Sequence, residues 1–186
     1  MQYSLLDQRA SGGFAELARQ HDVSLLCYGV LAGGFLTDAW LGMGDPGHEF
    51  ENRSLVKYRL IIDEFGGWEL FQELLRVLRT IAERHGVDIA NIAMRSTLDN
   101  PDVAATIIGA RYADRLPRSL RAFTINLSER DKTEIDQVLS RRSGPTGPVF
   151  GLERDLTGRH GRIMKYNLNK GENTQLRDAE TMPGTG

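Results

Sequence analysis

The spacing of hydrophobic positions changes along the N-terminal part of the chain, and each change marks a predicted element. Residues 3–6 and 23–28 are short continuous apolar runs, which are typical of buried strands. Between them, from Phe14 to His21, apolar residues recur at helical spacing. Gly29 follows the second run and favours a turn there. This part of the chain therefore predicts a strand, a helix and a second strand.

The central part predicts a loop and then the most regular helix of the sequence. Residues 42–52 include Pro46 and three glycines, so we expect a loop. Across residues 71–82 the apolar side chains form one stripe and charged residues occupy the opposite side. Gly86 stands where a glycine often ends a helix. We interpret the stripe as core, unless a missing part of the protein leaves it uncovered.

A second helix and strand follow. Asp88 can cap the next helix, which Pro101 stops before the apolar run at residues 103–108. Pro117 suits the first position of a helix better than its interior, so a further helical turn is predicted near it. Strands that alternate with helices predict a parallel sheet covered by helices. Three strands alone leave sheet edges exposed, which indicates that part of the sheet is missing.

The C-terminal part loses its periodicity after one more helix. Ser128, with Asp131 three residues later, resembles a capping box that opens this helix. From residue 143 to 186 glycine, proline and polar residues dominate, so we expect a mostly irregular tail. Its apolar stretches at 149–152 and 163–168 are candidate docking points.

Composition narrows the functional classes. The 186 residues are 40% hydrophobic and 26% charged, which excludes disorder throughout. Lysine and arginine (23) nearly balance aspartate and glutamate (25), so the charge indicates neither nucleic acid nor an anionic membrane as a partner. No apolar run approaches the roughly 20 residues of a membrane span. The N-terminus lacks the features of a signal peptide, so we expect a cytoplasmic protein.

Common catalytic and metal-binding motifs are absent from the sequence. It contains no HExxH, CxxC, GxSxG or GxxxxGK[ST] pattern, and we predict no metal site. The single cysteine, Cys27, lies within a predicted strand and is expected to be a buried apolar side chain. The four histidines, His21, His48, His85 and His160, are expected to be solvated rather than catalytic.

Two motifs resemble those of the aldo-keto reductases, which are NADP(H)-dependent oxidoreductases built on a (β/α)8 barrel. They are YGVLAGGFL at residues 28–36 and IIGAR at residues 107–111. The runs that begin at Gln2, Val23 and Val103 resemble the sixth, seventh and eighth barrel strands of that family. The resemblance implies an α/β fold: a partial TIM barrel with the C-terminal three βα units, additional helices and an irregular tail.

The likeness extends from Gln2 to about Arg142. We therefore expect residues 1–142 to be the C-terminal portion of an aldo-keto reductase domain and residues 143–186 to be a mostly irregular tail.

The resemblance also implies an NADP(H) site at the carboxyl ends of the strands, where sites on barrels lie. Tyr28 would stack on the nicotinamide, and Gln2 would hydrogen-bond its carboxamide. The family's pyrophosphate loop matches Gly29, Leu31, Ala32 and Gly33. Its loop after the last strand matches Gly109, Ala110 and Arg111, and Arg115 falls at the family's position near the 2′-phosphate.

Each of these residues also has a purely structural interpretation. Tyr28 could be a core aromatic, Gln2 part of a frayed terminus, the glycines ordinary turn residues and the arginines surface charges. Two departures from the family pattern concern the helix after the last strand. Pro117 interrupts it, and Ser119 stands where the family commonly has an asparagine.

Carbonyl reduction also needs a proton donor and oxyanion stabilisation. The family supplies these from an Asp, Tyr, Lys and His tetrad on its first four strands, which this chain lacks, and a full barrel takes about 250 residues. We therefore expect a cofactor-binding half with no catalytic residue, inactive alone, whose complete protein acts on a small aldehyde or ketone. The alternative is a non-catalytic interaction or nucleotide-sensing module that forms a homo-oligomer or pairs with a complementing chain.

Overall fold

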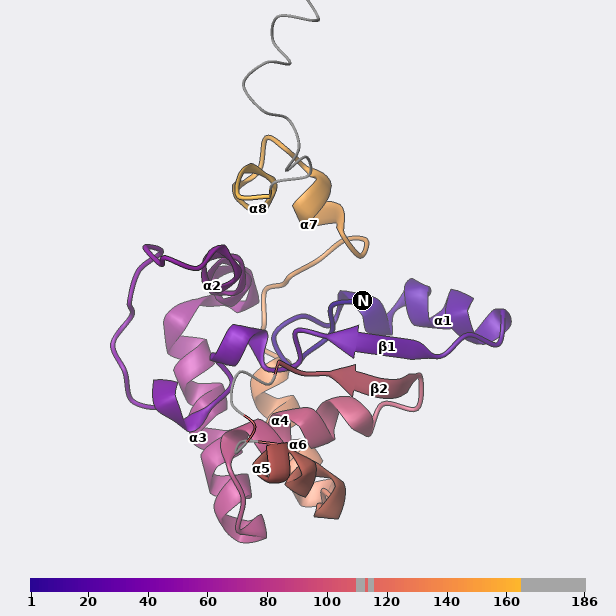
Figure 1. Cartoon of the computed structure of the whole chain (residues 1–186), viewed down its shortest axis with the longest axis vertical. Coiled ribbons are helices and arrows are strands. Elements are labelled where there is room, and N and C mark those ends of the chain that lie inside the picture. Colours follow the sequence, from indigo (N-terminus) through magenta and orange to yellow (C-terminus); the bar gives the residue numbers. More distant parts are fainter. Residues whose placement is uncertain (110–112, 114–115, 165–186) are drawn as a thin grey trace, which may run out of the picture.

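Two parallel strands form the sheet of the protein. The structure is a computed structural model that describes residues 1–109, 113 and 116–164. Strand β1 (Leu25–Tyr28) pairs with β2 (Val103–Ile107), so that Leu25 lies opposite Val103 and Tyr28 opposite Ile107 (Figure 1). Parallel neighbours need a long crossover, and the helices between β1 and β2 supply it. Both predicted strands are thus confirmed with slightly shorter bounds.

The predicted strand at residues 3–6 is wrong as a regular strand. Gln2 forms only an isolated parallel bridge with Tyr28. Ser4 and Asp7 then exchange backbone hydrogen bonds of 3.0 and 3.2 Å, which close a turn. The turn carries the chain away from β1 after a single paired position. The segment nevertheless runs beside β1 in the expected parallel direction.

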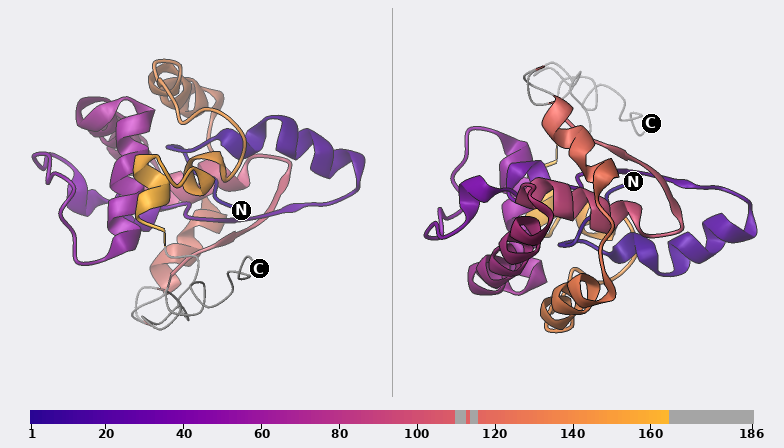
Figure 2. Two further views of the ribbon diagram at one scale, coloured as in Figure 1. Left: turned by 90° about the horizontal axis from the view of Figure 1, so that it is seen from above. Right: turned by 90° about the horizontal axis from the view of Figure 1, so that it is seen from below.

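Helices lie at both ends of the strand pair. Figures 1 and 2 show α1 at one end of the strand pair and α2 and α3 at the other. Their bounds are α1 (Gly13–Gln20), α2 (Arg53–Phe65), α3 (Gly67–His85), α4 (Ile89–Leu98), α5 (Leu116–Leu120), α6 (Glu129–Leu139), α7 (Gly151–Arg154) and α8 (Arg159–Arg162). The sequence pattern missed α2, because the charged Arg59 is buried among its apolar residues and interrupts the stripe.

Capping residues define the helix ends as the sequence predicts. Gly86 ends α3 in the left-handed conformation, with φ of 63°. Asp88 and Asn91 form a capping box at the start of α4, and Ser128 and Asp131 form another at the start of α6. Each side-chain cap is worth about 1 kcal/mol of stability.

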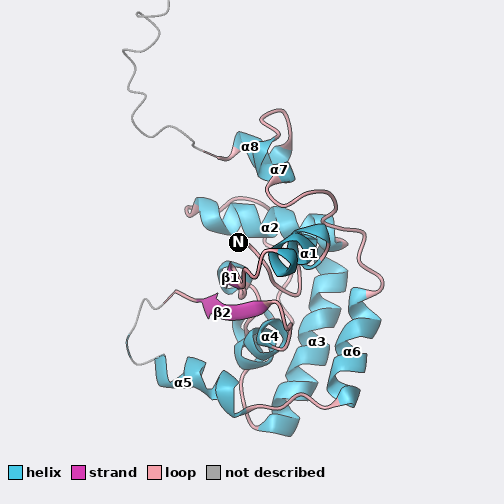
Figure 3. Cartoon of the chain, turned by 90° about the vertical axis from the view of Figure 1, so that its right-hand side faces the viewer, coloured by secondary structure: helices cyan, strands magenta, loops and turns pink. Residues whose placement is uncertain are grey.

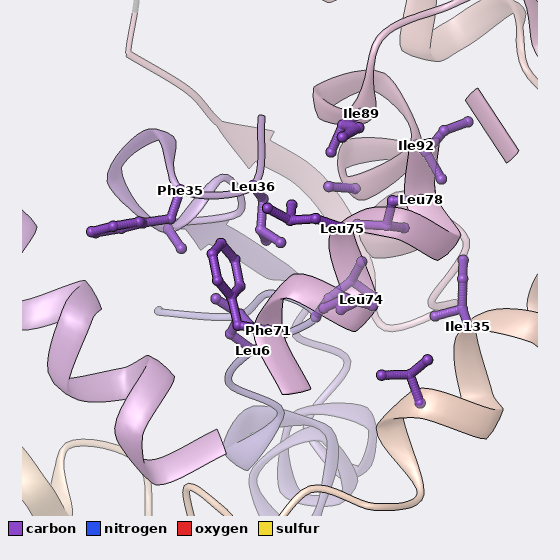
Figure 4. Close-up of a cluster of buried hydrophobic side chains, with 14 of the residues drawn as sticks. Leu6, Phe35, Leu36, Phe71, Leu74, Leu75, Leu78, Ile89, Ile92 and Ile135 are labelled. Atoms are coloured by element: carbon purple, nitrogen blue, oxygen red, sulfur yellow. The ribbon is translucent and has the colours of Figure 1, made fainter. Parts of the chain in front are cut away.

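The apolar stripe of α3 lies at the centre of the main hydrophobic core, as predicted. Phe71, Leu74, Leu75 and Leu78 are fully buried. Figure 4 shows the side chains that surround them, which come from the N-terminal segment, the loop after β1, α4 and α6: Leu6, Phe35, Leu36, Ile89, Ile92 and Ile135. One helix therefore joins elements from the whole length of the described chain.

The sheet is covered on one face only. Leu25 and Cys27 point to the face where α1 and α4 pack, and Cys27 is fully buried, as predicted. Side chains alternate along a strand, so Leu26 and Tyr28 point to the opposite face. There Leu26 is 56% exposed, and Ile107 of β2 is 55% exposed. This apolar face is uncovered by the described residues.

The described part of the C-terminal segment docks on the rest of the protein through the short helices α7 and α8 (Figure 3). Val149 and Leu152 pack against the two hydrophobic clusters, which agrees with the predicted docking point at residues 149–152. Arg159 of α8 contacts Asp63 of α2 at 2.7 Å. The second predicted docking point, 163–168, extends beyond the described residues.

Three of the four histidines contact a carboxylate. His48 lies 2.8 Å from Asp63, and His85 lies 3.0 Å from Asp131. His160 is only 3% exposed and contacts Glu64 at 3.2 Å, so the expectation that it is solvated was wrong. The chain folds back at this point and buries a residue for which the local sequence pattern indicates solvent.

Among the described residues, no helix combines the length and the apolar character that a membrane crossing requires.

Asp131 links α6 to α3 and generates a testable prediction. Its carboxylate accepts hydrogen bonds from Arg84, His85 and Ser128. Burial alone would raise the pKa of Asp131, but these bonds outweigh burial and hold the pKa well below its usual value. Asp131→Asn should therefore lower the free energy of unfolding by about 2 kcal/mol near neutral pH.

A carboxyl with a lowered pKa in the folded state stabilises above its unfolded pKa, 3.8, and loses this effect as the pH falls below that value. The difference between wild type and Asp131→Asn in urea unfolding should therefore shrink below about pH 4. Asp136→Asn, at an exposed position of the same helix, is the control and should change stability by less than about 0.5 kcal/mol. Equal effects of the two variants at neutral pH would contradict the prediction.

Candidate functional site at the strand ends

The structure brings two of the predicted cofactor residues together at the carboxyl end of β1. Tyr28 is the last residue of β1 and is half-buried. Gln2 lies beside it through the parallel bridge. Gly109 follows β2, whose end is next to Tyr28, and is exposed. Ala110, Arg111 and Arg115 lie outside the described residues.

The Gln2 side chain is held in one orientation by its nitrogen, while its oxygen makes no hydrogen bond. Its Nε2 atom donates a hydrogen bond of 2.7 Å to Oδ2 of Asp7, a fully buried carboxylate. The Oε1 atom of Gln2 is buried and has no hydrogen-bond partner. Buried acceptors without partners are uncommon, and they often mark a place that a ligand or a water completes. Gln2 is therefore held by its neighbours rather than frayed, and its role toward a cofactor stays a prediction.

The loop after β1 is shaped by Tyr58, a residue of α2. Gly29 and Gly33 both have left-handed φ values, 71° and 66°. A Cβ atom at Gly29 would lie 2.5 Å from the hydroxyl of Tyr58, and one at Gly33 would lie 2.6 Å from its ring. Both positions thus require glycine for conformation and for space. The packing of Tyr58 explains these glycines without a bound phosphate.

The backbone of this loop is partly committed to internal hydrogen bonds. The N–H of Ala32 donates to the carbonyl of Gly29 at 2.8 Å, and the N–H of Gly34 donates to that of Leu31 at 2.9 Å. These two amides cannot also bind a phosphate in this conformation. The predicted pyrophosphate role of Gly29, Leu31, Ala32 and Gly33 therefore stays a prediction.

Next to Gln2 lies a buried cluster of four charged side chains, which we call the strand-end cluster: Asp7, Arg9, Lys57 and Glu153. The guanidinium of Arg9 is 3% exposed and contacts both carboxylates. It reaches the Asp7 oxygens at 2.9 and 2.7 Å and the Glu153 oxygens at 3.2 Å each. The Nζ atom of Lys57 lies 3.7 Å from Glu153. Buried charges need partners of this kind because desolvation is costly.

The pKa values reflect these contacts. Burial opposes the charge on Arg9 and on Glu153, but their mutual hydrogen bonds outweigh it, so the pKa of Arg9 is raised and that of Glu153 lowered. Burial lowers the pKa of Lys57 despite the nearby Glu153. Burial also raises the pKa of Tyr58 to about 12, which keeps its hydroxyl protonated at neutral pH.

The ring of Tyr28 adjoins the strand-end cluster. The Nζ atom of Lys57 lies 5.6 Å from the centroid of the Tyr28 ring and 5.7 Å from that of Tyr58. Such distances allow a favourable cation–π interaction. The carboxylates of Glu153 and Asp7 add to burial in raising the pKa of Tyr28. Tyr28 is thus an aromatic surface beside fixed charges, at the edge of the core.

Residues 1–140 match the model of the Aldo/keto reductase family. The chain belongs to this family.

Curated relatives agree with this assignment. Protein tas of Escherichia coli strain K12 is 32% identical over 136 residues, which are 73% of this chain and 38% of tas. The uncharacterized oxidoreductase YrpG of Bacillus subtilis is 27% identical over 149 residues, which are 80% of this chain and 42% of YrpG. This aldo-keto reductase family chain therefore spans about two fifths of the length of the curated relatives it matches.

The fold is also that of the family. The solved glycerol dehydrogenase AKR11B4 from Gluconobacter oxydans matches with a TM-score of 0.62 and 23% identity. The match covers 79% of this chain and 43% of that protein. At this identity the likeness supports an α/β, TIM-barrel-like fold alone.

Two hollows in the described aldo-keto reductase chain lie outside the strand-end residues, and the smaller one, of about 280 Å³, is lined by Arg53, Val56, Arg162 and Ile163. The larger hollow, of about 540 Å³, lies between α3 and α6, away from the strand ends. Its arginines Arg84 and Arg141 are paired with Glu134 and Glu73. Within residues 1–109, 113 and 116–164, no group of three or more His, Cys, Asp and Glu side chains could hold a metal ion.

Sequence reasoning missed the whole strand-end cluster. Asp7 and Arg9 directly follow the first apolar run, where a charged pair is a weak signal for a strand-end site. Lys57 lies in α2, which the pattern did not reveal. Glu153 lies 144 residues from Arg9, so no local signal could have paired them.

The tight contact between Tyr58 and the loop yields a second prediction. Gly33→Ala should lower the free energy of unfolding by about 2 kcal/mol, because the alanine meets the Tyr58 ring and must adopt a left-handed φ. In a double-mutant cycle with Tyr58→Leu, the combined loss should be smaller than the sum, since the leucine relieves the clash. Gly44→Ala, at a position with open space, is the control for urea unfolding. Strict additivity would contradict the prediction.

Proposed function

We propose that this chain is the NADP(H)-binding, C-terminal part of an aldo-keto reductase barrel. The observation that carries the proposal is the unpartnered Oε1 atom of Gln2 beside Tyr28, at the ends of the strands. Membership in a family of oxidoreductases supports it. Sites on barrels lie at this end of the strands, which agrees with the location.

The described residues fit the nicotinamide end of the cofactor. A carboxamide carries an N–H donor, and the Gln2 Oε1 atom is an acceptor held in place by the hydrogen bond from Gln2 to Asp7. The half-buried ring of Tyr28 offers an apolar surface for stacking. Bound NADP(H) would supply the hydride. The chain's own contribution is to bind and orient the ring.

The phosphate end rests on the family resemblance. We propose that Gly29, Leu31, Ala32 and Gly33 adjoin the pyrophosphate after a local rearrangement that frees the committed N–H groups. Gly109, Ala110 and Arg111 would line the opposite side, and Arg115 would contact the 2′-phosphate. An arginine suits that role because its fork can bind a phosphate in two places.

We further propose that reduction of a small aldehyde or ketone needs the part of the barrel that its relatives have and this chain does not. The chain spans 38% of tas and 42% of YrpG. The uncovered apolar face at Leu26 and Ile107 supports this, because the interior face of a barrel strand is normally packed. Proton donation would come from the missing half, so the isolated chain would not turn over.

The same face favours a second candidate function. Exposed large apolar side chains also suit self-association, in which two copies cover each other's sheets. A homodimeric nucleotide-sensing module would use the same cofactor residues without catalysis.

The nicotinamide contact can be tested with a pair of cofactors. Wild type should bind NADP⁺ about tenfold more tightly than its acetylpyridine analogue, which lacks the carboxamide N–H donor. Gln2→Leu should bind both equally. Quenching of the fluorescence of Trp40 and Trp68 is the measurement. Equal affinities of wild type for the two cofactors would remove Gln2 from the site, and absence of saturable binding would overturn the cofactor proposal.

Complementation separates the two candidate functions. Mixing the chain with the part of tas that precedes its matched region should give NADPH oxidation with an aromatic aldehyde, while either chain alone gives none. Sedimentation velocity on the 186-residue chain is the second measurement. A stable homodimer that gains no turnover on mixing would favour the sensing module instead.

A further inference from the structure

Of the two carboxylates that contact Arg9, Glu153 makes the longer hydrogen bonds. Asp7 contacts the Arg9 guanidinium at 2.9 and 2.7 Å, whereas both Glu153 contacts with it measure 3.2 Å. Lys57 reaches Glu153 at only 3.7 Å. Charge-assisted N–H···O bonds are strongest at about 2.7–2.9 Å. Asp7 is therefore the firm partner of Arg9, and Glu153 is the looser one.

Glu153 lies on the shorter of the two helices that contribute to the cluster. It lies on α7, a helix of four residues, whereas Lys57 lies on the 13-residue helix α2. Phe150, just before α7, has a left-handed φ of 67°, which is unfavourable for a bulky side chain. Short elements with few packed side chains open locally more easily than the core does.

Departure of Glu153 would change the charge of the cluster. With Glu153 in place, two cations face two carboxylates. Without it, Arg9 and Lys57 face Asp7 alone, and the cluster carries one uncompensated positive charge in a buried setting. Such a charge is costly unless an anion replaces the lost partner.

The position that Glu153 occupies has the geometry of an anion site. Both Nη atoms of Arg9 point to its two oxygens, which is the fork arrangement that carboxylates and phosphates share. Lys57 adds a point charge from a second helix. Two neighbouring side chains adjoin the cluster: Gln2 through its hydrogen bond to Asp7, and the half-buried ring of Tyr28, whose centroid lies 5.6 Å from Lys57 Nζ.

We propose that Arg9 and Lys57 form an anion-binding site. The Glu153 carboxylate of the C-terminal segment fills this site in the structure. A carboxylate or phosphate group of a ligand occupies it when α7 moves away. Glu153 thus acts as an internal competitor. The inference goes beyond the cofactor proposal, because it concerns a different set of side chains and needs neither NADP(H) nor a complete barrel.

The test removes the negative charge of Glu153 and keeps the size of its side chain. Glu153→Gln should bind inorganic phosphate or acetate about tenfold more tightly than wild type does, measured by isothermal titration at fixed ionic strength with chloride as the background. Tighter binding of phosphate identifies a phosphate group as the ligand, and tighter binding of acetate identifies a carboxylate. The matched control is Asp136→Asn, which removes a carboxylate at an exposed position of α6. It changes the net charge equally and should leave anion binding as in wild type.

Two further measurements locate the effect. Adding Lys57→Gln to Glu153→Gln should abolish the gain in anion affinity. Lys57 is changed rather than Arg9, because loss of Arg9 would leave Asp7 buried without its main partner. Hydrogen exchange of the backbone amides of residues 151–155 should be about tenfold faster in Glu153→Gln than in wild type.

Anion affinities that are equal in wild type and Glu153→Gln would overturn the proposal. A gain that survives Lys57→Gln, or that Asp136→Asn reproduces, would do the same. All these readouts use phosphate, acetate or solvent exchange, so failure of NADP(H) binding leaves the inference standing. Its own failure equally leaves the cofactor proposal untouched.

Discussion

Burial of the Arg9 guanidinium between two carboxylates is the constraint on which the strand-end site depends. A buried arginine is tolerated only where its donors find acceptors. Here one acceptor, Asp7, belongs to the N-terminal segment, and the other, Glu153, belongs to the C-terminal segment. Asp7 also orients the Gln2 amide. A single cation thus links the carboxylate that orients a candidate cofactor ligand to a carboxylate of α7.

The core explains why the site is placed where it is. The stripe of α3 packs against α2, α4 and α6, and α2 in turn packs against the loop after β1. Tyr58 on α2 then lies across the loop that follows β1, and its neighbour Lys57 enters the strand-end cluster. On the opposite face of the sheet, Leu26 and Ile107 stay more than half exposed among the described residues.

Local patterns predicted much of the fold because local physics decides it. The stripe at residues 71–82, the left-handed Gly86 and the capping box at Ser128 each depend on residues within one or two helical turns. The same patterns failed for α2, where the buried Arg59 is neutralised by Asp45 and Asp63. They also failed for residues 3–6, where a turn between Ser4 and Asp7 ends the pairing.

The sequence by itself determined the helix at residues 71–82 and the capped helices that follow it, the direction of the two strands, the family motifs and the placement of Tyr28 at a strand end. Only the tertiary structure decided that Tyr58 requires the loop glycines, that His160 is buried and that Glu153 meets Arg9. The physical reason is distance along the chain. Periodicity and capping act over a few residues, whereas a buried charge takes its partner from any segment that the packing brings within reach, here one 144 residues away.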